Sequence, residues 1–165
     1  MKEYRKKTKL EKWLDASSLF GIGVMIIYIS IIWETLPHTI PTHFNGMGEV
    51  DGFGRKWSMF IHPTLGLGLY IFFNIFSRFP NLFNYPANTT KESKPLLFVN
   101  SRKMLSWMNV QIIMLCVYNT WENVQVAITE KTSISMLPFI IFMFVLFSTM
   151  ALYIVKGMRI ANAAS

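Results

Sequence analysis

The run ASSLFGIGVMIIYISIIW at residues 16–33 contains no charged residue and is long enough to cross a lipid bilayer. Three more apolar blocks follow, at residues 59–76, 104–128 and 134–153. Roughly 20 residues of helix span the hydrocarbon core, and within lipid a segment of this length can satisfy its backbone only as a helix. The chain, which is 52% hydrophobic over 165 residues, is therefore expected to be an all-α membrane protein, a single four transmembrane helix bundle covering residues 1–165.

Lysine and arginine are distributed unequally between the segments that separate these blocks. The N-terminal 15 residues, residues 78–103 and the C-terminal tail carry six, five and two of the 16 basic residues, and the intervening segments carry Arg55, Lys56 and Lys131. The positive-inside rule places both termini in the cytoplasm and residues 34–57 outside. This orientation accounts for the +7 net charge, so the lipid bilayer is the expected partner and nucleic acid is not.

The connection between the first two blocks, residues 34–57, is predicted to be an ordered outer loop. Residues 36–57 read LPHTIPTHFNGMGEVDGFGRKW, with two prolines and five glycines or asparagines, which are residues that specify turns. The segment from Thr39 to Phe44 is predicted to be extended, and Asn45-Gly46 is a strong signal for a tight turn. A simple connector between two helices does not need this pattern.

The same loop resembles a known bacterial family. The residues that carry the resemblance are Leu36-Pro37, Ile40-Pro41, His43-Phe44-Asn45, Gly48, Asp51-Gly52 and Lys56. This ordered set is similar to the signature of the domain of unknown function 1648 family, which forms the N-terminal part of SdpI-type immunity proteins. The resemblance implies a multi-pass plasma-membrane protein and, for some members, immunity to a secreted peptide toxin or a related sensing role. The chain is shorter than the founding type, which has more membrane spans.

The third apolar block carries several polar residues. Asn109, Cys116, Asn119 and Asn123 fall on one helical face by their spacings, and Glu122 lies beside it. Polar groups are costly in hydrocarbon unless they are paired, and a carboxylate more so, so this face is expected to point into the bundle. Hydrogen bonding between helices explains Asn109 and Gln111, but a buried carboxylate needs a partner.

The predicted topology gathers titratable residues at the outer end of the bundle. His62 and Glu122 are expected at similar depth, with Glu34 nearby and the loop residues His38, His43, Glu49 and Asp51 above them. We take this outer cluster as the candidate site. Its members, as ligand-binding or structural residues, are His43, Asn45, Gly48, Asp51, Lys56, His62, Asn119, Glu122 and Asn123.

Three chemistries compete for this cluster. It could bind a peptide or a lipid headgroup; it could hold a divalent metal through His43 with Asp51 or His62, since imidazole and carboxylate suit zinc; or His43, Asn45 and Asp51 could simply hold the turns of the loop by bonding to its backbone. For His62 a satisfied structural histidine is the simpler interpretation. No cofactor other than such a metal is predicted.

Sequence motifs of enzymes do not appear: the chain has no Gly-x-Ser-x-Gly, phosphate-binding glycine loop or zinc-protease helix. The leading hypothesis is a non-enzymatic membrane protein that senses, or gives immunity to, an extracellular agent such as a peptide toxin. An extracellular peptide and a cytoplasmic regulator are the candidate partners. The alternative is a small transporter subunit or a membrane enzyme that uses the outward-facing His/Glu/Asp cluster.

Overall fold

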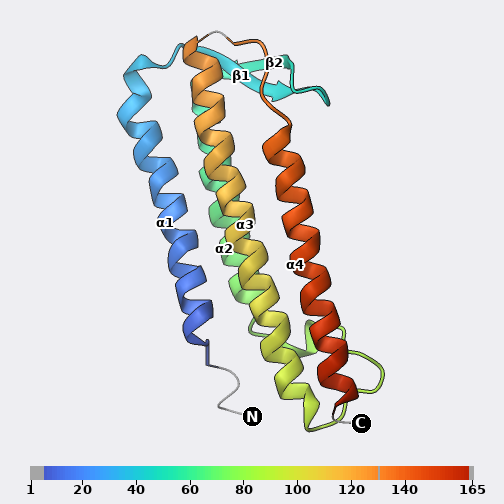
Figure 1. The fold of residues 1–165 in the computed structure, drawn as a ribbon. Helices are drawn as coiled ribbons and strands as arrows, with labels where there is room; N and C mark the ends of the chain where they lie inside the picture. Colours follow the sequence, from blue (N-terminus) through green and yellow to red (C-terminus); the bar gives the residue numbers. More distant parts are fainter. Residues whose placement is uncertain (1–5, 130, 164–165) are drawn as a thin grey trace.

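The computed structural model describes residues 6–129 and 131–163 and is mostly helical. Four α-helices run along its length (Figure 1): α1 (Lys9–Ile32), α2 (Ile61–Phe76), α3 (Ser93–Thr129) and α4 (Leu137–Asn162). A hairpin of β1 (Thr39–Phe44) and β2 (Val50–Arg55) separates α1 from α2. Three short 3₁₀ helices complete the order: η2 (Trp33–Thr35), η3 (Lys56–Phe60) and η4 (Pro80–Leu82).

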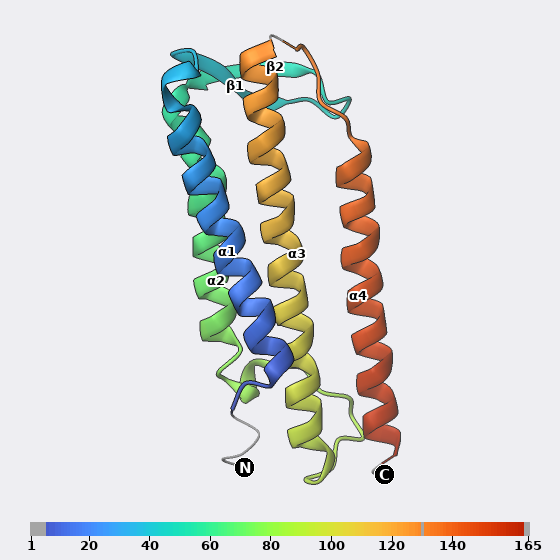
Figure 2. The same cartoon turned by 60° about the vertical axis from the view of Figure 1, so that its left-hand side comes forward.

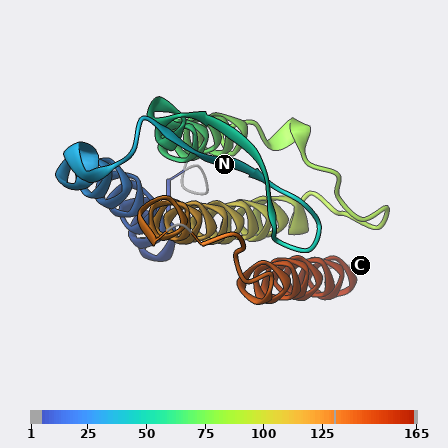
Figure 3. The ribbon, with the colours of Figure 1, turned by 90° about the horizontal axis from the view of Figure 1, so that it is seen from above.

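The helix α3 is the centre of the arrangement. It packs against α1, α2 and α4, whereas α4 has its extensive helix contacts with α3 alone. Figure 2 shows α4 beside α3 and away from α1 and α2. The hairpin lies across one end of the helices, and the start of α1 and the end of α4 lie at the other end (Figure 1). Seen from above, the hairpin crosses over α3 and its turn reaches toward α4 (Figure 3).

Three helical segments within the described residues are long and apolar enough to cross a membrane: Lys9–Thr35, Lys56–Phe76 and Leu137–Asn162. These helices indicate an integral membrane protein. The helix α3 is not among them, because the polar residues noted above interrupt its apolar sequence. Its length of 37 residues also exceeds one bilayer crossing.

The expectation of an all-α fold is wrong in one respect, because the outer loop contains a two-stranded antiparallel sheet. Thr39 pairs with Arg55, Ile40 with Gly54 and Phe44 with Val50. The predicted extended segment is β1. The prediction missed β2, whose glycines at alternate positions hide the usual strand pattern.

The helices extend beyond the predicted apolar blocks. The helix α1 begins at Lys9, seven residues before the predicted block, because Thr8 and Glu11 form a capping box: Thr8 Oγ1 accepts from the Glu11 amide at 3.3 Å, and Glu11 Oε2 accepts from the Thr8 amide at 2.7 Å. In the same way α3 begins at Ser93, where Thr90 and Ser93 exchange side-chain hydrogen bonds. An apolar block defines the membrane-crossing part of a helix but not its polar ends.

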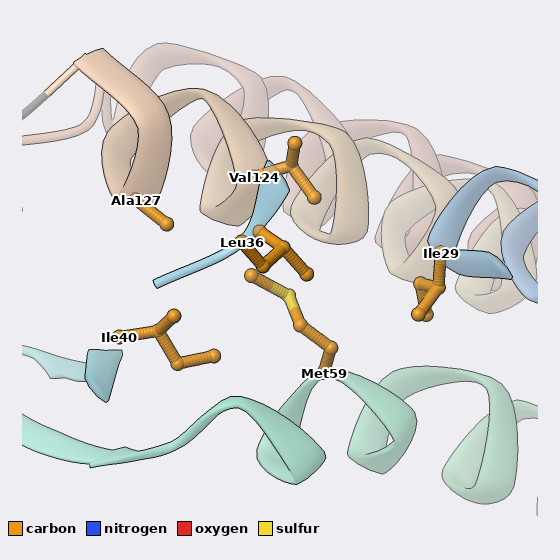
Figure 4. Packing of buried hydrophobic residues seen from close by; sticks show 6 residues of the cluster. All are labelled: Ile29, Leu36, Ile40, Met59, Val124 and Ala127. Atoms are coloured by element: carbon orange, nitrogen blue, oxygen red, sulfur yellow. The ribbon is translucent and has the colours of Figure 1, made fainter. Parts of the chain in front are cut away.

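A buried apolar cluster joins the hairpin to the helices (Figure 4). Ile40 of β1 and Met59 of η3 are completely buried, and Leu36 packs beside them against α1 and α3. The full buried cluster is Ile29, Leu36, Ile40, Met59, Val124 and Ala127. Burial of these side chains fixes the base of the hairpin on the ends of the helices.

Candidate functional site

The turn of the hairpin is built around Asn45. Its Oδ1 accepts from the backbone amides of Met47 at 2.9 Å and Glu49 at 3.0 Å, and its own amide nitrogen Nδ2 donates to Glu49 Oε2 at 2.9 Å. The backbone N–H of Asn45 also donates to the Glu49 carbonyl. Asn45 therefore holds the turn closed with both its side chain and its backbone.

The segment between α3 and α4 pairs with this turn. Val50 N donates to Thr132 O at 2.9 Å, and Ile134 N donates to Gly48 O at 2.8 Å. Gly48 has a φ of +83°, and a Cβ at this position would lie 2.4 Å from the Ile134 carbonyl oxygen. Only glycine fits here, for both conformational and steric reasons.

A cavity of about 220 Å³ lies beneath the hairpin, between α2, α3 and α4. His62 of α2 and Glu122 of α3 contribute to its wall, and Asn45 contributes from the turn above. The other polar lining residues are Thr42, Tyr118, Asn119, Asn123 and Ser135, and the apolar ones are Phe44, Ile134, Met136 and Phe139. We call this cavity the outer pocket, after the predicted outer loop that lies above it.

The outer pocket contains a buried carboxylate, that of Glu122, with one hydrogen-bond donor and no ion-pair partner among the described residues. Glu122 is 9% exposed, and its Oε2 accepts a hydrogen bond from the Tyr118 hydroxyl at 3.0 Å. Within residues 6–129 and 131–163 no lysine, arginine or histidine forms an ion pair with it. Two further groups in the wall, His62 Nδ1 and Asn123 Oδ1, are buried without a hydrogen-bond partner in the described part of the chain.

The nine predicted site residues divide into two groups. Asn45, His62, Asn119, Glu122 and Asn123 line the outer pocket. The other four, His43, Gly48, Asp51 and Lys56, belong to the hairpin and its base, outside the lining of the pocket.

These four residues have contacts that stabilise the loop. His43 Nδ1 contacts Asp51 Oδ1 across the hairpin, with side chains that are 71% and 42% exposed. Lys56 Nζ lies 4.4 Å from the centre of the Trp33 ring and donates to the Trp33 carbonyl at 3.3 Å. The His43–Asp51 contact is between side chains, whereas the predicted structural role had these residues bonding to the backbone.

The candidate metal ligands are not gathered in one place. His43 and Asp51 form the exposed pair, whereas His62 lies in the wall of the outer pocket. The described residues contain no group of three or more histidine, cysteine, aspartate or glutamate side chains arranged to hold a metal ion. Of the candidate metal ligands, only His43 and Asp51 therefore lie close enough together to bind one metal ion.

Comparison with known proteins identifies the segment that carries the hairpin. Residues 20–67 match the family model described as "Domain of unknown function (DUF1648)". This segment is similar to that family. The match spans the second half of α1, the hairpin and the first part of α2, so the matched segment supplies His62 and Asn45 to the outer pocket, whereas Glu122 lies outside it.

The chain is also similar to an uncharacterized protein of the archaeon Archaeoglobus fulgidus. The two are 26% identical over 153 residues, which cover 85% of this chain and 81% of the relative. The similarity therefore extends well beyond residues 20–67. No solved structure matches the chain. The predicted link to SdpI-type immunity proteins stays a prediction.

Sequence reasoning missed a buried ion pair outside residues 20–67, at the end of the helices opposite the hairpin. Glu11 and Arg102 are 1% and 3% exposed, and Arg102 Nε and Nη2 donate to the two carboxylate oxygens of Glu11 at 2.9 and 3.0 Å. The first 15 residues were expected to be a polar cytoplasmic tail. The spacing Thr8-x-x-Glu11 before an apolar run was the available signal for a helix start, but not for the partner of Glu11.

Proposed function

We propose that this chain is a multi-pass protein of the plasma membrane, with four transmembrane helices and both termini in the cytoplasm, whose outer pocket recognises an extracellular agent without catalysis. The proposed role is to sense that agent or to give immunity to it, and a peptide toxin is the leading candidate. Three apolar helices, the distribution of basic residues and the similarity to the DUF1648 family support this proposal.

The packing of α3 supports its assignment as the fourth span. Its polar residues Asn109, Thr120, Glu122 and Asn123 are each at most 9% exposed, so they contact other parts of the protein and would not contact lipid. Gln111 Nε2 donates to Thr149 of α4 at 2.8 Å. A helix can carry such residues through a membrane when its packing in the bundle keeps them away from lipid.

The observation that carries the proposal is the carboxylate of Glu122, which is buried, has one neutral donor and lines a cavity. A buried charge is costly unless it is paired. A ligand with an ammonium or guanidinium group would supply the missing partner and further hydrogen-bond donors. We therefore expect the ligand to present a lysine, an arginine or a free amino terminus to Glu122.

The rest of the wall suggests the other half of the ligand. Phe44, Met136 and Phe139 give the pocket an apolar side, and aromatic and methionine side chains adapt readily to apolar groups. A cationic and partly apolar peptide combines both requirements. The hairpin, fixed by Asn45 and Gly48, forms a rigid cover over the binding position.

The test is protection of cells by defined variants. A strain that lacks the gene is complemented with the wild type, Glu122→Gln or Glu34→Gln and challenged with secreted cationic peptides. Glu34 is an exposed carboxylate in η2 at the same end of the bundle, so Glu34→Gln controls for loss of one charge. We expect Glu122→Gln to lower the inhibitory peptide concentration to that of the deletion strain, with Glu34→Gln unchanged and all proteins equally abundant in the membrane.

Two results would contradict the proposal. Equal peptide sensitivity of the deletion and wild-type strains would remove the immunity role, and full protection by Glu122→Gln would remove the recognition role of the carboxylate. The alternative, a transporter subunit or membrane enzyme, has support from His62 and Glu122 in the wall of one pocket, since both residue types transfer protons. It predicts substrate uptake or turnover that is lost in Glu122→Gln.

A further inference from the structure

A second cavity lies at the end of the molecule opposite the hairpin. It has a volume of about 620 Å³ and lies between the segment before α1 and the facing sides of α3 and α4. Three lysines from these three segments line it: Lys6, Lys103 and Lys156. No aspartate or glutamate is among its lining residues in the described part of the chain. We call it the lysine cavity.

The lysines lack protein counter-charges. Among residues 6–129 and 131–163, none of the three forms an ion pair with a carboxylate. Thr8, the N-cap of α1, also lines the cavity, so the positive end of the α1 dipole borders the same space. The three lysine side chains and the N-terminus of α1 all make the electrostatic potential in the cavity more positive. This potential attracts an anionic ligand.

The buried ion pair described above positions one of these lysines. Arg102 Nη2 donates to the backbone carbonyl of Lys6 at 2.9 Å while the same guanidinium binds Glu11. Arg102 also stacks over the Phe98 ring at 5.1 Å. The chain before α1 is thereby held against α3, which brings Lys6 to the wall that Lys103 and Lys156 share.

Apart from Thr8 and Asn100, the rest of the wall is apolar. Leu96, Val99 and Ile160 line the cavity beside the lysines, and Leu96 is 49% exposed. A small soluble anion would use only the charged part of this surface. An anionic phospholipid would use both parts, with its phosphate among the lysines and its glycerol and acyl groups along the apolar side chains.

We propose that the lysine cavity binds the phosphate of an anionic phospholipid at the cytoplasmic surface of the membrane. Basic pockets between helices on this side are suited to such headgroups. This site goes beyond the proposed recognition function and rests only on the membrane insertion and orientation proposed above.

The experiment is native mass spectrometry of the full-length protein, released from detergent with either phosphatidylglycerol or phosphatidylcholine. We expect the wild type to retain phosphatidylglycerol in preference to phosphatidylcholine. The variant Lys103→Gln/Lys156→Gln should bind phosphatidylglycerol more weakly by roughly fivefold or more for each lysine removed. Lys91→Gln/Lys131→Gln, which removes two exposed lysines outside the cavity, is the matched control and should keep the preference.

Two further measurements test whether a loss of lipid binding comes from the lost charge and whether the ligand is a lipid or a soluble phosphate. Lys103→Arg/Lys156→Arg should retain phosphatidylglycerol, which separates loss of charge from misfolding. Competition by millimolar glycerol phosphate that fully displaces the lipid would overturn the lipid proposal in favour of a soluble phosphate. Equal binding of the two lipids by the wild type, or an unchanged preference in Lys103→Gln/Lys156→Gln, would also overturn it. None of these readouts requires the extracellular agent, so this proposal can fail or succeed independently of the recognition function.

Discussion

Glu11 and Arg102 lie 91 positions apart and form a bidentate ion pair that is almost completely buried. The pair joins the first turn of α1 to α3. Breaking it by removal of one partner leaves the other charge buried and uncompensated, which costs far more than the net stability of the pair itself.

We expect Arg102→Met to reduce the free energy of unfolding by roughly 3–5 kcal/mol. The double variant Glu11→Leu/Arg102→Met should recover much of this loss, because it leaves no isolated charge. Unfolding in mixed detergent micelles, followed by circular dichroism, measures both. Equal losses in the single and double variants would show that the charge imbalance is not the cause.

Gly48→Ala tests the contact between the hairpin turn and the α3–α4 connection. A methyl group would meet the Ile134 carbonyl oxygen in a residue whose φ is +83°, so we expect a loss of roughly 1–3 kcal/mol and faster proteolysis of the hairpin. Gly46→Ala is the control, since nothing lies within 4 Å of its Cβ position. The prediction fails if the two variants are cleaved at the same rate.

Asn45→Ala removes the side-chain oxygen that accepts from the amides of Met47 and Glu49. Each lost hydrogen bond contributes about 1 kcal/mol, so these two amides should exchange with solvent deuterium faster than in the wild type. Amides in the middle of α3 should keep their protection. Unchanged exchange at both Met47 and Glu49 would contradict the role assigned to Asn45.

The proposed orientation predicts which engineered cysteines an impermeant reagent reaches in intact cells. Met47 of the turn is 79% exposed, and Lys91 lies exposed before α3, at the opposite end. We expect Met47→Cys to be labelled and Lys91→Cys to be labelled only after the cells are opened. The native Cys116 is buried in α3 and is replaced by serine in both variants. The reverse labelling pattern would invert the topology and place the outer pocket inside.

Much of the helical fold could be predicted from the sequence, because a long apolar run in a membrane can satisfy its backbone hydrogen bonds only as a helix. It also indicated the β1 segment and the turn at Asn45-Gly46. It did not reveal β2, or the pairing of Ile134 with Gly48, since that contact uses backbone groups and leaves no pattern in the side chains.

The sequence predicted how far along the helices the site residues lie, but not which way their side chains point. Counting residues along a helix gives the height of His62 and Glu122, and both do line one pocket. The rotation of each helix depends on tertiary packing, which residue counting does not include. His43 and Asp51 were placed with His62 because the strand pairing of the hairpin could not be foreseen, and neither residue lines the outer pocket.

The pairing of Thr132 and Ile134 with the hairpin turn closes part of the free edge of β2. A polypeptide that stopped after α3 would leave the amide of Val50 and the carbonyl of Gly48 open to neighbouring molecules. Open strand edges recruit other strands. The segment from Thr132 to Ile134 thus occupies backbone groups of the hairpin that would otherwise be open to pairing with a strand of another molecule.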